Sequence, residues 1–191
     1  PNLPPSSIRW SGPPDCAVMR DLSRLAREAT DGDREALQEF VVAIQADVWR
    51  FCAHLTRVDD ADDLAQEALL RIVANLHRWE RGPVKTWALG VTRNVCYEHL
   101  RRRYRHRTDP VADPTTPPVA DHTGLVDVYR LLAELSLDQR EAILLTQLIG
   151  LPYAEAAEIA GCPIGTIRSR VARGRDILAD ALRPERRHVS D

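Results

Sequence analysis

A proline-rich stretch divides this chain into two segments that both carry helical apolar spacing. The stretch runs from Thr108 to Thr123, "TDPVADPTTPPVADHT", and has almost no large apolar side chain. Proline lacks the amide hydrogen that a helix interior needs, so no regular helix crosses such a stretch. Apolar residues recur every three or four positions on both sides, without the alternation typical of strands. The sequence therefore predicts an all-α protein of two small helical domains joined by a flexible linker at 108–123.

The N-terminal segment predicts a helical domain over 19–107. A turn signal at 31–33, Asp-Gly-Asp, separates its first two helices, and "ERGP" at 80–83 separates its last two. Between these breaks, one apolar stripe has helical spacing: Leu64, Ala68, Ile72 and Leu76. Residues 1–18 are rich in proline, serine and glycine and predict a disordered extension, as do residues 184–191 at the other end.

Composition excludes several classes of protein. The chain is 44% hydrophobic and 28% charged, as is typical of a globular protein. No apolar run approaches the roughly 18 residues of a membrane span, and the N-terminus lacks the pattern of a secretion signal. We therefore expect a cytoplasmic protein without membrane contact. The net charge of −2 hides a segregation, because arginines gather at 101–107 and aspartates at 59–63.

The cysteines predict neither a metal site nor a disulfide framework. Cys16, Cys52, Cys96 and Cys162 lie far apart in the sequence and form no C-x-x-C pair or Cys/His cluster. We expect ordinary reduced thiols, no metal and no cofactor.

The C-terminal segment, 124–183, has the outline of a helix-turn-helix. A helix "DQREAILLTQLIG" ends at Gly150, a shorter helix ends at Gly161, and the tight turn Cys162-Pro163 leads into a long final helix. At about 100° per residue, Ile167, Val171, Gly174 and Leu178 share the side of this helix that must face its neighbours.

The opposite side of the final helix is a candidate DNA-reading face. The planar fork of arginine pairs with a guanine edge or with phosphate, and small residues between the arginines favour insertion into a major groove. A merely solvated arginine face is the alternative, which the tight turn disfavours. Arg170 and Arg175 flank the core side, where either phosphate contacts or ion pairs within the domain are expected. The reading face consists of Thr166, Arg168, Ser169, Ala172 and Arg173.

Three motifs together resemble the extracytoplasmic-function (group 4) sigma factors of bacterial RNA polymerase. The stretch "LSLDQREAILLTQLIGLPYAEAAEIAGCPIGTIRSRVARGRDIL" resembles region 4 of that family. "DDADDLAQEALLRIVANL" resembles the core-binding motif of region 2, and "KTWALGVTRNVCYEHLRRR" resembles the helix that follows it. The motifs occur in the family's order on either side of the linker, and the resemblance covers nearly all of the chain from Asp21 to Leu182.

The resemblance implies core RNA polymerase as a partner, through the β′ clamp helices and the β flap. It assigns the clamp contact to Asp63, Gln66, Glu67, Leu70 and Arg71. The aspartates at 59–62 have a plainer interpretation as an N-terminal helix cap favoured by the helix dipole. A Mg²⁺ site is disfavoured, because no second set of carboxylates is evident.

The resemblance also implies promoter DNA as a partner at two elements. Tyr153 joins the reading face of the final helix at the minus-thirty-five element. The loop "HRWERGPVK", His77 to Lys85, would capture a flipped base at the minus-ten element. For Trp79 in that loop, packing is favoured over base stacking. His99 and the arginines of 101–107 add positive charge for the strand. The named candidates for the minus-ten element and its phosphates are His77, Arg78, Trp79, Arg81, Lys85, Arg93, Asn94, Arg101 and Arg102.

The sequence therefore favours an alternative sigma factor that directs promoter-specific initiation and has no catalysis of its own. An anti-sigma factor is a further candidate partner. The second hypothesis is a stand-alone helix-turn-helix regulator, which would bind duplex DNA without polymerase. A hydrolase using His54 or His77 is disfavoured, because no nucleophile stands in a turn and no paired carboxylates line an evident cleft.

Overall fold

The computed structural model describes residues 16–106 and 125–182, and these ranges contain helices and no strand. The N-terminal part holds α1 (Cys16–Thr30), α2 (Arg34–Leu55), α3 (Val58–Asn75), the 3-10 turn η1 (Leu76–Arg78) and α4 (Val84–His106). The C-terminal part holds α5 (Leu125–Ala133), α6 (Leu137–Ile143), the π-helical segment η2 (Leu144–Leu148), α7 (Tyr153–Ala160) and α8 (Ile164–Ala181). The predicted all-α class is confirmed.

Only some of the predicted domain boundaries fall within the described residues. Helix α1 begins at Cys16, so residues 16–18 are helical where the sequence predicts an extension. The rest of that extension, the predicted linker at 108–123 and the predicted tail at 184–191 lie outside the described residues. No helix in the described ranges is long and apolar enough to cross a membrane.

Local signals set the helix ends of the N-terminal bundle. Asp33 caps α2, because its side chain accepts hydrogen bonds from the backbone amides of Glu35 and Ala36 at 2.9 and 3.1 Å. The preceding Gly32 has a φ of 101°, which suits glycine in the predicted turn. The predicted stripe on α3 is buried along its whole length and packs in one core with α1, α2 and α4.

Two of the cysteines meet inside this core. Cys52 on α2 and Cys96 on α4 are fully buried, with their Sγ atoms 3.6 Å apart. A disulfide would bring the sulfurs to about 2.05 Å, so these are two free thiols in contact. The hydrogen bond to Cys52, together with burial, raises the pKa of the Cys96 thiol. Sequence separation alone gave no sign of this contact.

The C-terminal part has the predicted helix-turn-helix. Ser136 and Gln139 form a capping box at the start of α6, and Gly161 ends α7 in the left-handed conformation with a φ of 64°. Ile167 and Val171 of α8 are buried against the preceding helices, as the helical spacing predicts. Gly174 brings α8 close to α6, since a Cβ atom at that position would lie 3.1 Å from Cγ1 of Ile143.

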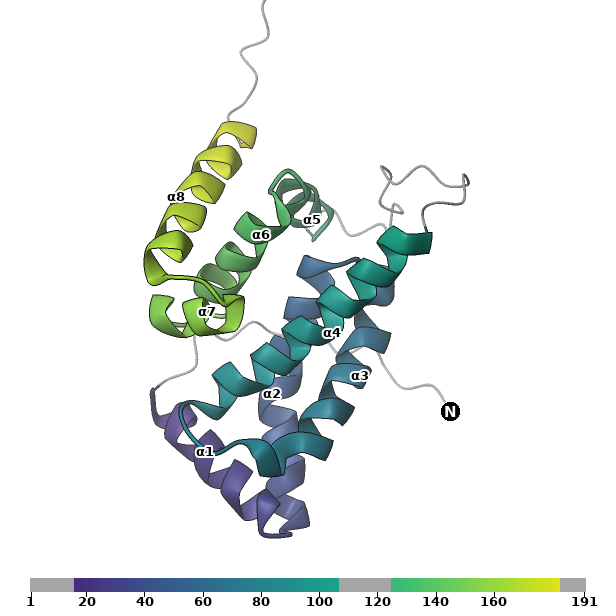
Figure 1. The fold of residues 1–191 in the computed structure, drawn as a ribbon, viewed down its shortest axis with the longest axis vertical. Coiled ribbons are helices and arrows are strands. Elements are labelled where there is room, and N and C mark those ends of the chain that lie inside the picture. Colours follow the sequence, from purple (N-terminus) through teal and green to yellow (C-terminus); the bar gives the residue numbers. More distant parts are fainter. Residues whose placement is uncertain (1–15, 107–124, 183–191) are drawn as a thin grey trace, which may run out of the picture.

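The two bundles pack against each other along α4. Figure 1 shows α4 running between the C-terminal helices on one side and helices α2 and α3 on the other. Thr86 on α4 donates a hydrogen bond to the carboxylate of Glu155 on α7, and Arg93 on α4 pairs with Glu141 on α6. The His54 ring on α2 stacks on Tyr129 of α5 with 4.7 Å between centroids. The surface of α4 that faces α6 and α7 is therefore covered in this conformation.

Candidate nucleic-acid and protein interfaces

Helix α8 presents a polar face of small side chains and arginines to solvent. Arg168, Ser169, Ala172 and Arg173 are all exposed, and Thr166 is partly exposed near the helix start. The Ser169 hydroxyl donates to the backbone carbonyl of Thr166 at 2.9 Å, which keeps this side chain flat against the helix. Only the small side chains of Ser169 and Ala172 lie between the two arginines, so the surface of the helix there is flat enough to enter a DNA groove.

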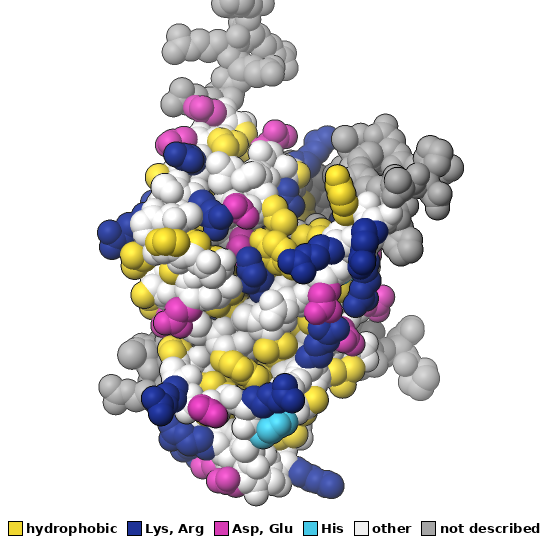
Figure 2. All heavy atoms as spheres, in the orientation of Figure 1, with side chains coloured by type: hydrophobic (Ala, Val, Ile, Leu, Met, Phe, Trp, Pro, Cys, Tyr) yellow, Lys and Arg dark blue, Asp and Glu magenta, His cyan; other side chains and the backbone are white. Residues whose placement is uncertain are grey.

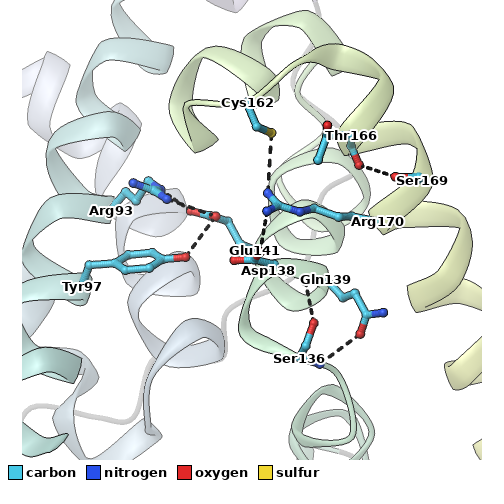
Figure 3. A network of polar contacts seen from close by, with 10 residues as sticks. All are labelled: Arg93, Tyr97, Ser136, Asp138, Gln139, Glu141, Cys162, Thr166, Ser169 and Arg170. Carbon is cyan, nitrogen blue, oxygen red and sulfur yellow. Dashed lines mark hydrogen bonds and ion pairs between the residues drawn. The ribbon is translucent and has the colours of Figure 1, made fainter.

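The neighbouring arginines of α8 are held inside the domain. Arg170 pairs with Asp138 of α6 at 2.5 Å and lies 3.5 Å from the Cys162 sulfur (Figure 3). Arg175 donates a hydrogen bond to the side-chain oxygen of Gln147. Of the two alternatives that the sequence left open for Arg170, the structure contains the ion pair within the domain. Tyr153 lies half-buried at the start of α7, packed against the core.

The candidate polymerase face on α3 is largely exposed. Asp63, Gln66, Glu67 and Leu70 point outward, and the Leu70 side chain is 61% exposed. Arg71 differs from them, because its guanidinium bridges Glu67 on α3 and Glu98 on α4 at 2.7 and 2.9 Å. Arg71 therefore orients the edge of this face and joins it to α4.

The aspartates at the start of α3 differ from the predicted helix cap. The N-cap residue is Arg57, and no side chain makes a capping hydrogen bond there. Asp59 and Asp60 do lie in the first turn, where the helix dipole favours negative charge. The Asp60 carboxylate makes tertiary contacts that the sequence did not reveal, with His99 and Arg103 of α4 at 3.2 and 2.7 Å, whereas Asp59 pairs locally with Arg57 at 3.4 Å.

The loop before α4 holds both exposed and buried candidates. His77, Arg78 and Arg81 are exposed. Trp79 packs against the core, as the sequence interpretation favoured, and its indole nitrogen donates to the Gly82 carbonyl at 3.2 Å. Lys85 is only 7% exposed, with its ammonium 2.6 Å from an Asp47 oxygen. In this conformation Lys85 is therefore not available at the surface.

Arg93 is covered by a buried carboxylate from the other bundle. Glu141 on α6 is 1% exposed and accepts hydrogen bonds from the Arg93 guanidinium and, at 3.1 Å, from the Tyr97 hydroxyl (Figure 3). The Arg93 guanidinium also lies 4.2 Å from the centroid of the Tyr97 ring. Burial by itself lowers the pKa of Arg93, but hydrogen bonding and charge from Glu141 together raise it. Arg93 is a fixed cation in this contact.

The remaining candidates lie on α4, and the arginines among them lie in its C-terminal half. Asn94, Arg101 and Arg102 are exposed, and Arg102 has only a 3.5 Å ion pair to Glu98. Figure 2 shows Lys and Arg side chains gathered along this half of α4, on the face turned to the viewer. The region is therefore a positive surface that an anionic strand could follow.

Sequence reasoning missed the partners that join the bundles, above all Glu141. One signal was available, because Glu141 shares a helical face with the apolar residues of its own helix. A carboxylate in such a position needs a buried partner. No such signal pointed to Glu155 or Asp47. Within the described residues, no group of three or more His, Cys, Asp or Glu side chains is placed to hold a metal ion.

Comparisons with known proteins agree with this arrangement. The family model Sigma-70 region 2 matches residues 40–106, and the model Sigma-70, region 4 matches residues 125–178. The chain is 48% identical to the ECF RNA polymerase sigma factor SigC of Mycobacterium tuberculosis over 168 residues, 84% of this chain and 91% of that protein. It is 33% identical to the ECF sigma factor EcfG of Rhodopseudomonas palustris, covering 78% of this chain and 86% of the relative.

A solved structure has the same fold. The sigma factor RpoE of Bartonella quintana, crystallised with the anti-sigma factor NepR, superimposes with a TM-score of 0.68 at 33% identity. The match covers 78% of this chain and 98% of that one.

Two helical bundles matched by the sigma-70 region 2 and region 4 models define a sigma-70-type subunit of RNA polymerase. Within that class, the chain belongs to the extracytoplasmic-function sigma factors. It is an alternative sigma factor that directs promoter-specific transcription, and the hypothesis of a stand-alone regulator is not favoured.

Proposed function

We propose that the exposed face of α8 reads the minus-thirty-five element in a major groove. The observation that carries this proposal is a contrast between arginines of one helix. Arg170 and Arg175 are held by Asp138 and Gln147, whereas no hydrogen bond or ion pair within the described residues engages Arg168 or Arg173. Arginines left without partners beside small residues are suited to pairing with guanine edges and phosphates. Thr166 and Tyr153 would border the contact.

The loop at 77–85 and the basic half of α4 are proposed to capture and hold the minus-ten strand. Exposed His77, Arg78 and Arg81 would meet the strand first, and Trp79 would support the loop by packing. Asn94, Arg101 and Arg102 offer the next contacts along α4. Arg93 can join them only after Glu141 releases it, so strand binding through Arg93 requires the two bundles to separate.

The α3 face of Asp63, Gln66, Glu67 and Leu70, bordered by Arg71, is proposed to dock on the β′ clamp helices of core polymerase. The C-terminal bundle would contact the β flap. The protein would act in the cytoplasm without catalysing a reaction, and an anti-sigma factor would be a fitting regulator. This last point is supported by the complex of the Bartonella quintana relative with its anti-sigma factor.

Run-off transcription tests the proposal. Purified core RNA polymerase is assayed with and without the protein on a promoter library with a melted bubble. We expect specific transcripts only with the protein. Arg173→Ala should lower the amount of these transcripts by about 5- to 150-fold, the effect of losing one bidentate base contact of about 1–3 kcal/mol. Asp63→Ala should lower them through weaker core binding.

Arg175→Ala is the matched control, because it removes an arginine of the same helix that is held by Gln147. Its transcript level should stay within about twofold of the wild type, since a surface contact of this kind contributes little. Transcripts independent of the protein, together with a duplex DNA shift by the protein alone at low salt, would contradict the proposal.

A further inference from the structure

A cavity of about 700 Å³ lies along the C-terminal half of α4, next to the start of α6. Its wall is built by side chains of α4 between Tyr97 and Arg105 and, from the other bundle, by Leu137 of α6. A volume of about 300–1,000 Å³ is usual for a small-molecule site. Because Leu137 forms part of the wall, the cavity is complete only while the two bundles pack against each other.

The wall of the cavity is positively charged. It holds three arginines and one glutamate, Glu98, whose carboxylate is already bound by Arg71 at 2.9 Å. No hydrogen bond or ion pair within the described residues engages Arg101, and Arg102 has only the 3.5 Å contact with Glu98. These two guanidinium groups therefore have donors available for an anion, and arginine binds phosphate through parallel hydrogen bonds. The third arginine of the wall is Arg105.

Two tyrosines add aromatic surface to the wall. Tyr97 is held in place, because its hydroxyl donates to Glu141 at 3.1 Å and the Arg93 guanidinium lies 4.2 Å from the centroid of its ring. Burial raises the pKa of Tyr97 to about 12, so the hydroxyl keeps the proton that this hydrogen bond needs. The Tyr104 side chain is 78% exposed. Tyr104 is therefore the ring on which a planar ligand can stack.

We propose that this cavity binds a nucleoside polyphosphate, with its base stacked on Tyr104 and its phosphates paired with Arg101 and Arg102. Stacking on an aromatic side chain accepts any base, since every base has a π-face. The ligand is a free nucleotide rather than a DNA strand. Leu137 closes the cavity from the side of the C-terminal bundle, whereas strand binding through Arg93 requires that bundle to move away.

A nucleotide in this cavity favours the packed conformation of the two bundles. A ligand that binds one of two conformations better shifts the equilibrium towards it. Arg101 and Arg102 are also proposed contacts of the minus-ten strand, so the bound nucleotide would occupy them and oppose capture of the strand. The cavity and its ligand do not depend on that proposed role.

The test measures binding of ATP labelled on its ribose to the full-length chain, by fluorescence anisotropy. Arg101→Ala and Tyr104→Ala should each weaken the affinity by about fivefold or more, through loss of a phosphate contact and of stacking. Tyr104→Phe keeps the ring and should bind like the wild type. Arg103→Ala is the matched control, because Arg103 lies on the same helix outside the cavity wall and is held by Asp60 at 2.7 Å. Its affinity should be unchanged.

Unlabelled competitors distinguish a nucleotide site from general attraction of anions. ATP should displace the probe about fivefold or more better than inorganic triphosphate, because the triphosphate lacks the stacked base. Equal displacement by triphosphate would overturn the inference in favour of non-specific attraction. Equal weakening by Arg101→Ala and Arg103→Ala would do the same, and so would a wild type that does not bind ATP.

Leu137→Asp tests whether the site needs both bundles, because it places a carboxylate of the C-terminal bundle beside the bound phosphates. It should weaken ATP binding by about tenfold or more, since like charges across a contact repel. Leu182→Asp is its control, because Leu182 lies in the same bundle outside the cavity wall and is 65% exposed. The affinity of this control should match that of the wild type.

Equal affinity of Leu137→Asp and the wild type would mean that α4 alone binds the nucleotide, as it would an anionic strand. That result would overturn the inference and leave the minus-ten proposal in place. If circular dichroism finds Leu137→Asp unfolded, the comparison of Arg101→Ala with Arg103→Ala still decides the matter, because both arginines are exposed.

Discussion

His54, near the end of α2, has a buried Nδ1 atom without a hydrogen-bond partner, and its ring stacks on Tyr129. Burial first, and the charge of Arg50 second, lower the pKa of His54 from 6.5 to about 4. In the unfolded chain the pKa returns to its ordinary value, so the unfolded state takes up the proton first as the pH falls. The contribution of neutral His54 to the free energy of unfolding is therefore fully present above about pH 6.5, and it is lost as the pH falls from there to about 4.

This shift predicts a pH dependence that one substitution removes. At pH 5 the wild type should have lost about 2 kcal/mol of unfolding free energy through His54, at about 1.4 kcal/mol per pKa unit. His54→Phe keeps a ring against Tyr129 and cannot titrate. Between pH 7.5 and pH 5 this variant should therefore lose about 2 kcal/mol less unfolding free energy than the wild type. Urea unfolding at the two pH values measures the difference. Equal losses in both proteins would mean that His54 is protonated in the folded state.

At the scale of one element, α8 contains two glycines in different surroundings. A Cβ atom at Gly165 would meet nothing within 4 Å, whereas one at Gly174 would lie 3.1 Å from Ile143 on α6. Gly165→Ala should therefore stabilise the protein by about 0.5–1 kcal/mol through helix propensity. Gly174→Ala should stabilise the protein less than Gly165→Ala does, because Ile143 must shift to make room for the new methyl group. Gly174→Val should destabilise the protein by about 1–3 kcal/mol through overpacking. Thermal unfolding measures all three, and an equal gain from both alanines would contradict close packing of α8 on α6.

The conformation of the whole molecule depends on contacts between the two bundles. Glu141→Gln removes the charge that pairs with Arg93 and leaves a half-buried guanidinium without its counter-ion, at a cost of about 3–5 kcal/mol in comparable sites. We therefore expect the bundles to separate and the radius of gyration from small-angle X-ray scattering to increase. Arg93→Ala, which breaks the contact from the other side, should have the same effect.

Glu134→Gln is the control for this prediction, because Glu134 is an exposed glutamate outside the contact with α4. Its scattering curve should match that of the wild type. If Glu141→Gln also scatters like the wild type, the buried ion pair does not hold the bundles together.

The sequence by itself determined the helices and the two-part organisation. Apolar spacing on α3 and α8 identified the buried residues, and Asp33 and Gly161 marked helix ends, because helical period, caps and left-handed glycines are local properties of the chain. The motifs that resemble the sigma-factor family lie within single helices and short turns, so the family could also be recognised without a structure.

The tertiary structure alone decided which charged residues are available. Lys85 and Arg93 were both expected at the DNA surface, but the first is buried against Asp47 and the second is covered by Glu141. The same holds for the contact of Trp49 with Asp62 and for that of Cys52 with Cys96. Each of these pairs joins residues on different helices. Whether such side chains meet depends on how the helices pack, and no local pattern in the sequence encodes that distance.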